Sequence, residues 1–77
     1  MTPDEIRRIA EPLNCDTFVA CRFVNRQSEG VFRFVFVERN GDLALCGTHP
    51  EAPCFLVKAE RVVSIRPATD EDIEFAE

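Results

Sequence analysis

The apolar residues near the amino terminus recur at the spacing of an α-helix. This stripe consists of Ile6, Ile9, Ala10 and Leu13. Ahead of it, Thr2 and Glu5 have the spacing of a capping box, in which each side chain accepts a hydrogen bond from the other residue's backbone N–H. Pro12 cannot donate the hydrogen bond that a continuing helix needs. We therefore predict a helix within residues 1–13 that packs on another element, because so short a helix is not stable alone.

From residue 17 onward, the hydrophobic pattern changes to that of β-strands. The predicted strands cover residues 17–26, 31–39, 42–46, 55–60 and 61–66, and the last two are either separate strands or one bent strand. Asn40 and Gly41 lie between two apolar runs, which is the strongest short-range signal for a β-hairpin. Pro67 ends the last strand, so the predicted sheet region covers residues 17–67.

Residues 69–77 form an acidic tail whose pattern fits two structures. Thr69 suits the N-cap of a helix, and the acids that follow it suit the first turn, where the helix dipole favours negative charge. Ile73 and Phe75, in contrast, are two residues apart, which is the period of a strand. We predict a short helical turn.

Together these elements predict one α+β domain, because 77 residues are too few for two domains. A short helix followed by a curved antiparallel meander of about five strands favours a small barrel or half-barrel. The segment FLVKAERVVSIRPA, residues 55–68, resembles in its residue types the closing strands of Sm-like and SH3-like small barrels. This resemblance implies a fold only, and no functional residue follows from it.

The formal net charge of −5 comes entirely from the tail. Residues 1–67 hold equal numbers of basic and acidic side chains, whereas residues 70–77 hold five acids and no base. A neutral body with an acidic tail disfavours broad attraction to nucleic acid or anionic lipid. The sequence has no signal-peptide pattern and no run of the ~20 apolar residues that span a membrane. We expect a soluble cytoplasmic protein with reduced thiols.

The segment CGTHPEAPC places the chain's one histidine between two cysteines. Four interpretations are open, namely a metal site, a disulfide, a reactive thiol, and a turn stiffened by its prolines. The spacing does not match the tight cysteine pairs of structural zinc sites, so Cys46, His49 and Cys54 are weak ligand candidates. A disulfide across a hairpin is geometrically easier, but a cytoplasmic address disfavours it. We expect a plain turn with free thiols and no bound cofactor.

Sequence motifs for catalysis are absent. The chain contains no nucleophile elbow, no glycine-rich phosphate loop and no zinc-protease motif. With one histidine and two serines, it offers few groups that could serve as nucleophile and base. We expect no enzymatic activity.

The predicted strand 31–39 is apolar on both of its faces. One face carries Phe32, Phe34 and Phe36, and the other carries Val31, Val35 and Val37, interrupted by Arg33. A strand that is apolar on both faces has to be covered on both. The amino-terminal helix and the tail could provide this cover within one chain. A second copy of the chain or a partner protein could also provide it.

These features lead us to expect a small regulatory or inhibitory protein that acts by binding another protein, with a homodimer as one form. An acidic segment with apolar anchors can dock onto a basic groove of a partner, although such a tail can also be a solvated terminus. The candidate partner-binding residues are Asp70, Asp72, Ile73, Glu74 and Phe75.

The alternative is a nucleic-acid-binding module of the Sm-like or SH3-like kind. Aromatic side chains interleaved with arginines on a sheet can stack single-stranded bases. The candidate residues for such a face are Phe18, Arg22, Arg26 and Arg33. The neutral body and the acidic tail disfavour this alternative, and a solvated face with cross-strand ion pairs explains the same arginines.

Overall fold

Two α-helices, five strands and one 3₁₀ turn follow one another along the chain. This computed structural model describes residues 1–76, and the side chains of residues 1–74. The elements are α1 (Pro3–Ala10), β1 (Phe18–Phe23), β2 (Gly30–Val37), β3 (Leu43–Cys46), β4 (Cys54–Val57), η1 (Ala59–Arg61), β5 (Val62–Pro67) and α2 (Asp70–Ala76). The segment predicted as one bent strand or two contains two strands, because η1 intervenes. Among the described residues, no helix has the length and apolarity needed to cross a membrane.

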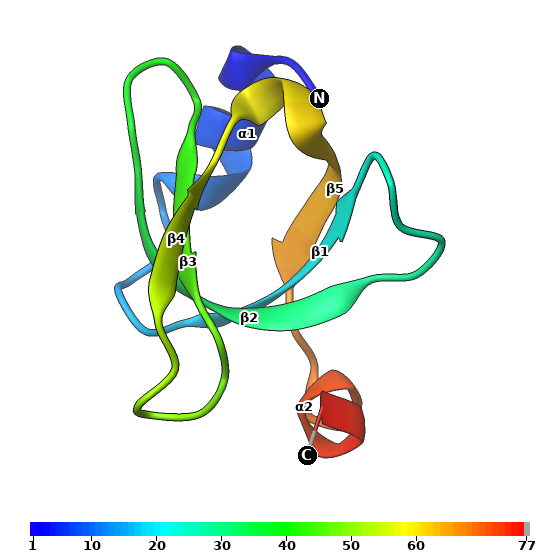
Figure 1. Cartoon of the computed structure of the whole chain (residues 1–77). Helices are drawn as coiled ribbons and strands as arrows, with labels where there is room; N and C mark the ends of the chain where they lie inside the picture. Colours follow the sequence, from blue (N-terminus) through cyan, green and yellow to red (C-terminus); the bar gives the residue numbers. More distant parts are fainter. Residues whose placement is uncertain (77) are drawn as a thin grey trace.

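The strands form one antiparallel sheet in the order β4-β3-β2-β1-β5. The first four strands form a meander, and β5 returns to pair with β1. The sheet is strongly curved but open, since β4 and β5 are its two edges (Figure 1). The predicted α+β class, with a helix, five antiparallel strands and a short carboxyl-terminal helix, is confirmed. An Sm-like or SH3-like barrel is not confirmed, because the sheet does not close.

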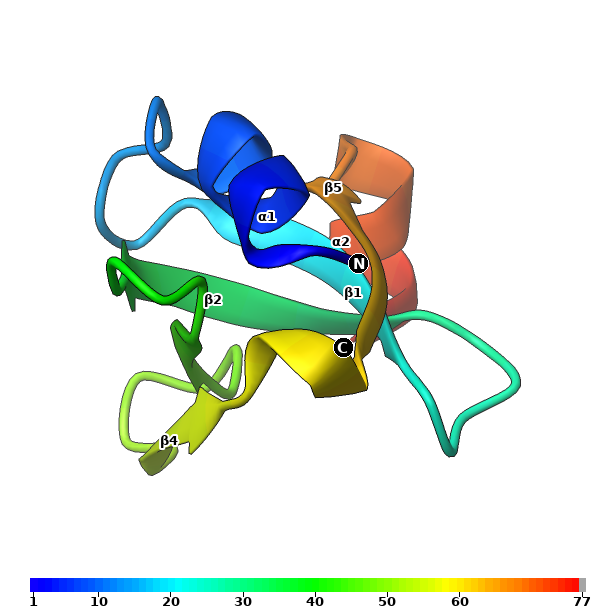
Figure 2. The same cartoon turned by 90° about the horizontal axis from the view of Figure 1, so that it is seen from above.

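The helix α1 closes one end of the curved sheet, where it packs against β2, β5 and η1. The predicted capping box is confirmed. The Thr2 hydroxyl accepts from the Glu5 N–H at 3.2 Å, and the Glu5 carboxylate accepts from the Thr2 N–H at 3.4 Å. Ile6 and Ala10 are fully buried among the inward side chains of the sheet. The two helices lie at opposite ends of the molecule, α1 beside η1 and α2 beyond β2 (Figures 1 and 2).

A β-bulge in β2 changes which of its side chains face the core. The register with β3 shifts between Phe34 and Phe36, so that Phe34 and Val37 both lie opposite fully buried leucines. Phe34 is 3% exposed, whereas Phe36 is 48% exposed. The prediction that Phe32, Phe34 and Phe36 share one face is therefore wrong for Phe36, because the extra residue reverses the alternation of the strand.

The predicted hairpin at Asn40 and Gly41 joins β2 to β3. The Gly41 N–H donates to the carbonyl of Glu38 at 2.9 Å, and Gly41 has a positive φ of 87°. A Cβ atom at this position would lie 2.6 Å from the Cα atom of Pro3, at the start of α1. Glycine is therefore needed here both for the turn and for the close approach of α1.

Candidate functional site

The acidic tail is docked on its own sheet, because α2 packs against β2 (Figure 1). The Thr69 hydroxyl accepts from the Asp72 N–H at 3.3 Å, which is the N-cap that the sequence predicts. Arg66 of β5 donates to the Asp72 carboxylate at 2.8 and 3.2 Å, and the Thr69 N–H donates to it at 2.8 Å. The hydrogen bond from Arg66, followed by those from Thr69, holds the pKa of Asp72 well below its usual range.

Docking leaves part of the predicted partner-binding set facing solvent. Asp72 and Ile73 are half-buried within the chain, whereas Asp70 and Glu74 are exposed. The side chain of Phe75 lies outside the described residues. The role of this set in partner binding stays a prediction, and among its described side chains the carboxylates of Asp70 and Glu74 are exposed.

Arg66 also holds the loop between β1 and β2. Its Nε and Nη2 atoms donate to the two oxygens of Glu29 at 3.1 and 3.0 Å. The hydrogen bonds to Asp72 and then to Glu29 raise the pKa of Arg66 above its ordinary value. A single guanidinium group thus joins β5, the β1–β2 loop and α2.

The residues of the predicted nucleic-acid face lie on β1, on β2 and in the loop after β1. Phe18 and Arg33 are cross-strand neighbours on β1 and β2, and Arg22 lies further along the same face of β1. The guanidinium of Arg33 lies 3.7 Å from the carboxylate of Asp16. Arg26 lies in the loop after β1 and lines a hollow. Arg22 donates to the carbonyl of Arg26 at 3.3 Å, so the two arginines are neighbours, and a nucleic-acid role for these four residues stays a prediction.

Cys46 and Cys54 form a disulfide. The register of β3 and β4 places the two residues directly opposite each other, with their Cα atoms 4.1 Å apart. The expectation of a plain turn with free thiols is therefore wrong for this pair, because the hairpin geometry brings the sulfurs together. Cys15 and Cys21 are free, and Cys15 is exposed.

The oxidised sulfurs change the chemistry of the loop. A disulfide offers zinc no thiolate ligand, and the Nδ1 atom of His49 accepts from the N–H of Glu51 at 3.1 Å. In the part of the chain that the structure describes, no three His, Cys, Asp or Glu side chains are grouped as metal ligands. Burial, followed by the charge of Glu29, raises the pKa of Cys21 to about 12, so this thiol stays protonated at neutral pH.

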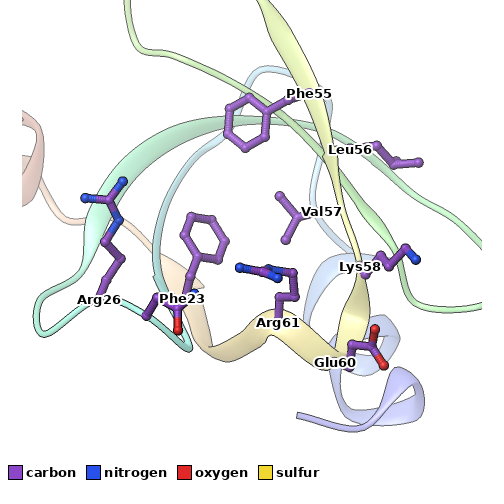
Figure 3. Close-up of a pocket in the computed structure, with 9 residues that line it drawn as sticks. Phe23, Arg26, Phe55, Leu56, Val57, Lys58, Glu60 and Arg61 are labelled. Carbon is purple, nitrogen blue, oxygen red and sulfur yellow. The ribbon is translucent and has the colours of Figure 1, made fainter.

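A hollow of about 710 Å³ lies between β4, η1 and the end of β1 (Figure 3). We call this hollow, together with the free side of β4, the edge groove. The lining of the edge groove includes Phe23, Arg26, Phe55, Leu56, Val57 and Arg61. Sequence reasoning missed the edge groove, because its walls come from distant segments that are brought together by the curvature of the sheet.

Aromatic rings form the inner wall of the edge groove. The ring centroids of Phe23 and Phe32 are 5.5 Å apart, and those of Phe32 and Phe55 are 5.7 Å apart. A second hollow of about 390 Å³ is also lined by Phe23, Arg26 and Phe55, so the two hollows adjoin the same side chains. The edge groove therefore offers an apolar surface large enough for an aromatic or aliphatic side chain.

The strand β4 is apolar on both sides of the sheet. Phe55 lies opposite an inward leucine of β3 and Leu56 lies opposite Ala44. Phe55 is 40% exposed and Leu56 is 54% exposed. On the convex side, the half-exposed Phe36 lies opposite the same Ala44, so Phe36 and Leu56 flank it. The apolar surface that the two helices leave uncovered is thus concentrated near β4.

The free side of β4 presents backbone groups that no other described strand uses. In an antiparallel pair, narrow positions, whose residues direct N–H and C=O away from the partner strand, alternate with hydrogen-bonded positions. The Cys46–Cys54 pair is narrow, since its Cα atoms are 4.1 Å apart. The register places Leu56 in the same orientation as Cys54. Cys54 and Leu56 therefore direct their N–H and C=O groups toward the free edge.

The charges that face the hollow are positive. Figure 3 shows the guanidinium of Arg61 pointing between Phe23 and Val57, whereas Lys58 and Glu60 point away from the centre. Arg26 lies at the side of the hollow. Among the described residues, neither Arg26 nor Arg61 forms an ion pair through its side chain. The edge groove is thus locally basic on a chain whose formal net charge is −5.

Comparisons with protein-family models, with curated proteins and with solved structures find no match to this chain.

Proposed function

We propose that this protein is a small non-enzymatic regulator or inhibitor that works by binding another protein at the edge groove. The observation that carries the proposal is the coincidence of exposed apolar side chains with an unpaired strand edge. Leu56 and Phe55 are 54% and 40% exposed on a strand whose outer backbone groups have no partner strand among the described residues. Large contiguous apolar patches on a protein surface mark interaction sites.

Photo-crosslinking tests this proposal. A photoreactive amino acid at position 56 should crosslink the same protein repeatedly from a lysate of the host. The same amino acid at position 39, an exposed site in the hairpin loop between β2 and β3, serves as the control. Equal crosslinking from both positions, or none from position 56, would refute the proposal.

Nucleic-acid binding is the second candidate, together with an Sm-like or SH3-like relationship of the curved sheet. One observation favours it. Phe23 and Phe55 lie beside Arg26 and Arg61 in the edge groove, and rings next to arginines can stack single-stranded bases. Fluorescence anisotropy with a single-stranded oligonucleotide at low salt is the test. This candidate fails if high micromolar protein gives no salt-dependent signal.

The predicted cytoplasmic address stays a prediction, and the disulfide supports the opposite view, because disulfides persist mainly in oxidising compartments. Thiol counting on protein trapped in acid directly from its host would decide between the two. An oxidised Cys46–Cys54 pair in freshly trapped protein would argue against a reducing compartment.

A further inference from the structure

The edge groove has features that restrict the chemistry of its occupant, and the following inference rests on the proposed function. Its outward backbone groups, its apolar wall and the two arginines that form no ion pair with a described residue lie next to one another. Each of these three features selects a different property of a ligand.

The backbone groups select an extended main chain. Cys54 and Leu56 direct N–H and C=O groups to the free side of β4, so an incoming strand can continue the ladder there. The strand β4 has four residues, Cys54–Val57, and therefore pairs with a short segment.

The apolar wall selects one large side chain of that segment. Phe55 and Val57 lie opposite inward leucines of β3, so they face the concave side of the sheet. Phe23 lies across the hollow from them (Figure 3). A residue of the incoming strand that points to the concave side would place its side chain among these three.

The arginines select negative charge on the same side of the incoming strand. Arg61 points into the hollow, and Arg26 lies at its side (Figure 3). Residues two positions before and after the apolar anchor point to the same face of a strand as the anchor does. Carboxylates at these two positions would meet the guanidinium groups, with which they form bidentate hydrogen bonds.

We propose that the edge groove binds an extended acidic segment of another protein, with the pattern acid–x–aromatic–x–acid, as an additional strand beside β4. The two arginines give the edge groove a positive charge that is complementary to acidic side chains, on a body (residues 1–67) whose formal charges sum to zero. A single-stranded nucleic acid would also supply negative charge and rings, but it has no main-chain amides to pair with β4. The edge therefore favours a peptide.

The test uses synthetic peptides and the full chain in its oxidised form. The probe is the acetylated and amidated heptapeptide Thr-Asp-Thr-Phe-Thr-Asp-Thr, and the matched control has Lys in place of both Asp residues. Amide chemical shifts report where each peptide binds. We expect the acidic peptide to shift the amides of residues 54–57, 23, 26 and 61, and the Lys peptide to bind at least about fivefold more weakly. N-methylation of the peptide at alternate residues should abolish binding, because it blocks the ladder.

Charge reversal provides the second arm. The variant Arg26→Glu/Arg61→Glu should prefer the Lys peptide over the acidic one, whereas Arg39→Glu, which changes an exposed arginine in the β2–β3 loop, should bind like the unchanged chain. All three arginines are exposed, so these variants are expected to fold.

Three outcomes would overturn the inference. The first is binding of neither peptide, or equal binding of both. The second is a stronger shift of the same amides by a seven-nucleotide single strand. The third is a dimer by light scattering whose interface contains residues 54–57, because a second copy would then fill the edge groove. If neither peptide binds while crosslinking from position 56 succeeds, the proposed binding of another protein is retained and the proposed acidic occupant is rejected. Failure of both experiments removes the proposed function as well.

Discussion

At the scale of single residues, two backbone positions determine how the helix and one strand pack. Gly41 allows α1 to lie against the β2–β3 hairpin, and the bulge at Val35 turns Phe36 out of the core. Neither effect follows from residue type alone. A glycine after asparagine predicts a turn, but not the helix that lies against it. Alternation places the three phenylalanines of β2 on one face. This prediction fails for Phe36, because the residues themselves carry no reliable signal of a β-bulge.

Gly41→Ala is expected to destabilise the fold by about 2–4 kcal/mol, because alanine is strained at positive φ and its Cβ would collide with Pro3. Urea denaturation followed by circular dichroism gives the free energy of unfolding. Arg39→Ala, two residues earlier in the same loop, is the control and should change it little. Equal stability of the two variants would show that α1 does not approach the turn so closely.

At the scale of elements, covalent and ionic links fasten the edge strand β4 and the carboxyl-terminal helix α2. The four-residue strand β4 is fastened to β3 by the Cys46–Cys54 bond, and α2 is fastened to β5 by Arg66 and Asp72. The sequence offers the Cys46–Cys54 disulfide as one interpretation, although free thiols are expected, and it singles out Asp72 but not Arg66. Which cysteines and which charges meet depends on the register and on the curvature of the sheet.

Reduction of the Cys46–Cys54 bond is expected to lower the free energy of unfolding by about 2.5 kcal/mol, because the bond closes a short loop in the unfolded chain. Urea denaturation with and without a phosphine reductant measures the difference. Cys15→Ser, which changes an exposed free cysteine, should leave the difference unaltered. Identical unfolding curves for oxidised and reduced protein would contradict the expectation.

Acid is expected to release α2. The pKa of Asp72 is lowered in the folded chain, mainly by Arg66, so its ionisation stabilises the docked helix at neutral pH. This contribution is complete above the ordinary aspartate pKa of about 3.9 and is lost as the pH falls through the lowered value. The amide shift of Thr69, which donates to Asp72, should therefore titrate well below pH 3.9. Asp72→Asn should remove this titration, and Glu71→Gln should keep it. A midpoint at the ordinary value would mean that the ion pair does not form in solution.

At the scale of the whole molecule, the sequence predicts the list of elements better than their assembly. Helix α1 with its cap, the five strands and the carboxyl-terminal helix follow from local patterns, because caps, turns and periodicity are encoded by neighbours. The return of β5 to β1, the open edge at β4 and the edge groove depend on residues far apart in sequence. The position of the candidate site therefore follows from the structure, whereas the excess of apolar strand surface in the sequence only favours a covering element or partner.

Arg66 connects the β1–β2 loop to α2, so its loss should reduce the order of both segments. Arg66→Ala is expected to speed amide hydrogen exchange in the β1–β2 loop, through Glu29, and in α2, through Asp72. Arg66→Lys should restore one contact at most, because an ammonium group cannot form two bidentate pairs. Arg39→Ala should leave both segments unchanged. Faster exchange in α2 alone would mean that the Glu29 contact contributes nothing to the order of the loop.

The distribution of the sulfurs has a practical consequence. Cys21 is buried in its protonated form, and Cys46 and Cys54 are bonded to each other, which leaves Cys15 exposed in the segment between α1 and β1. A maleimide dye added to the native chain should therefore attach at one defined position. The molecule can carry a fluorophore for single-molecule work without any engineered cysteine.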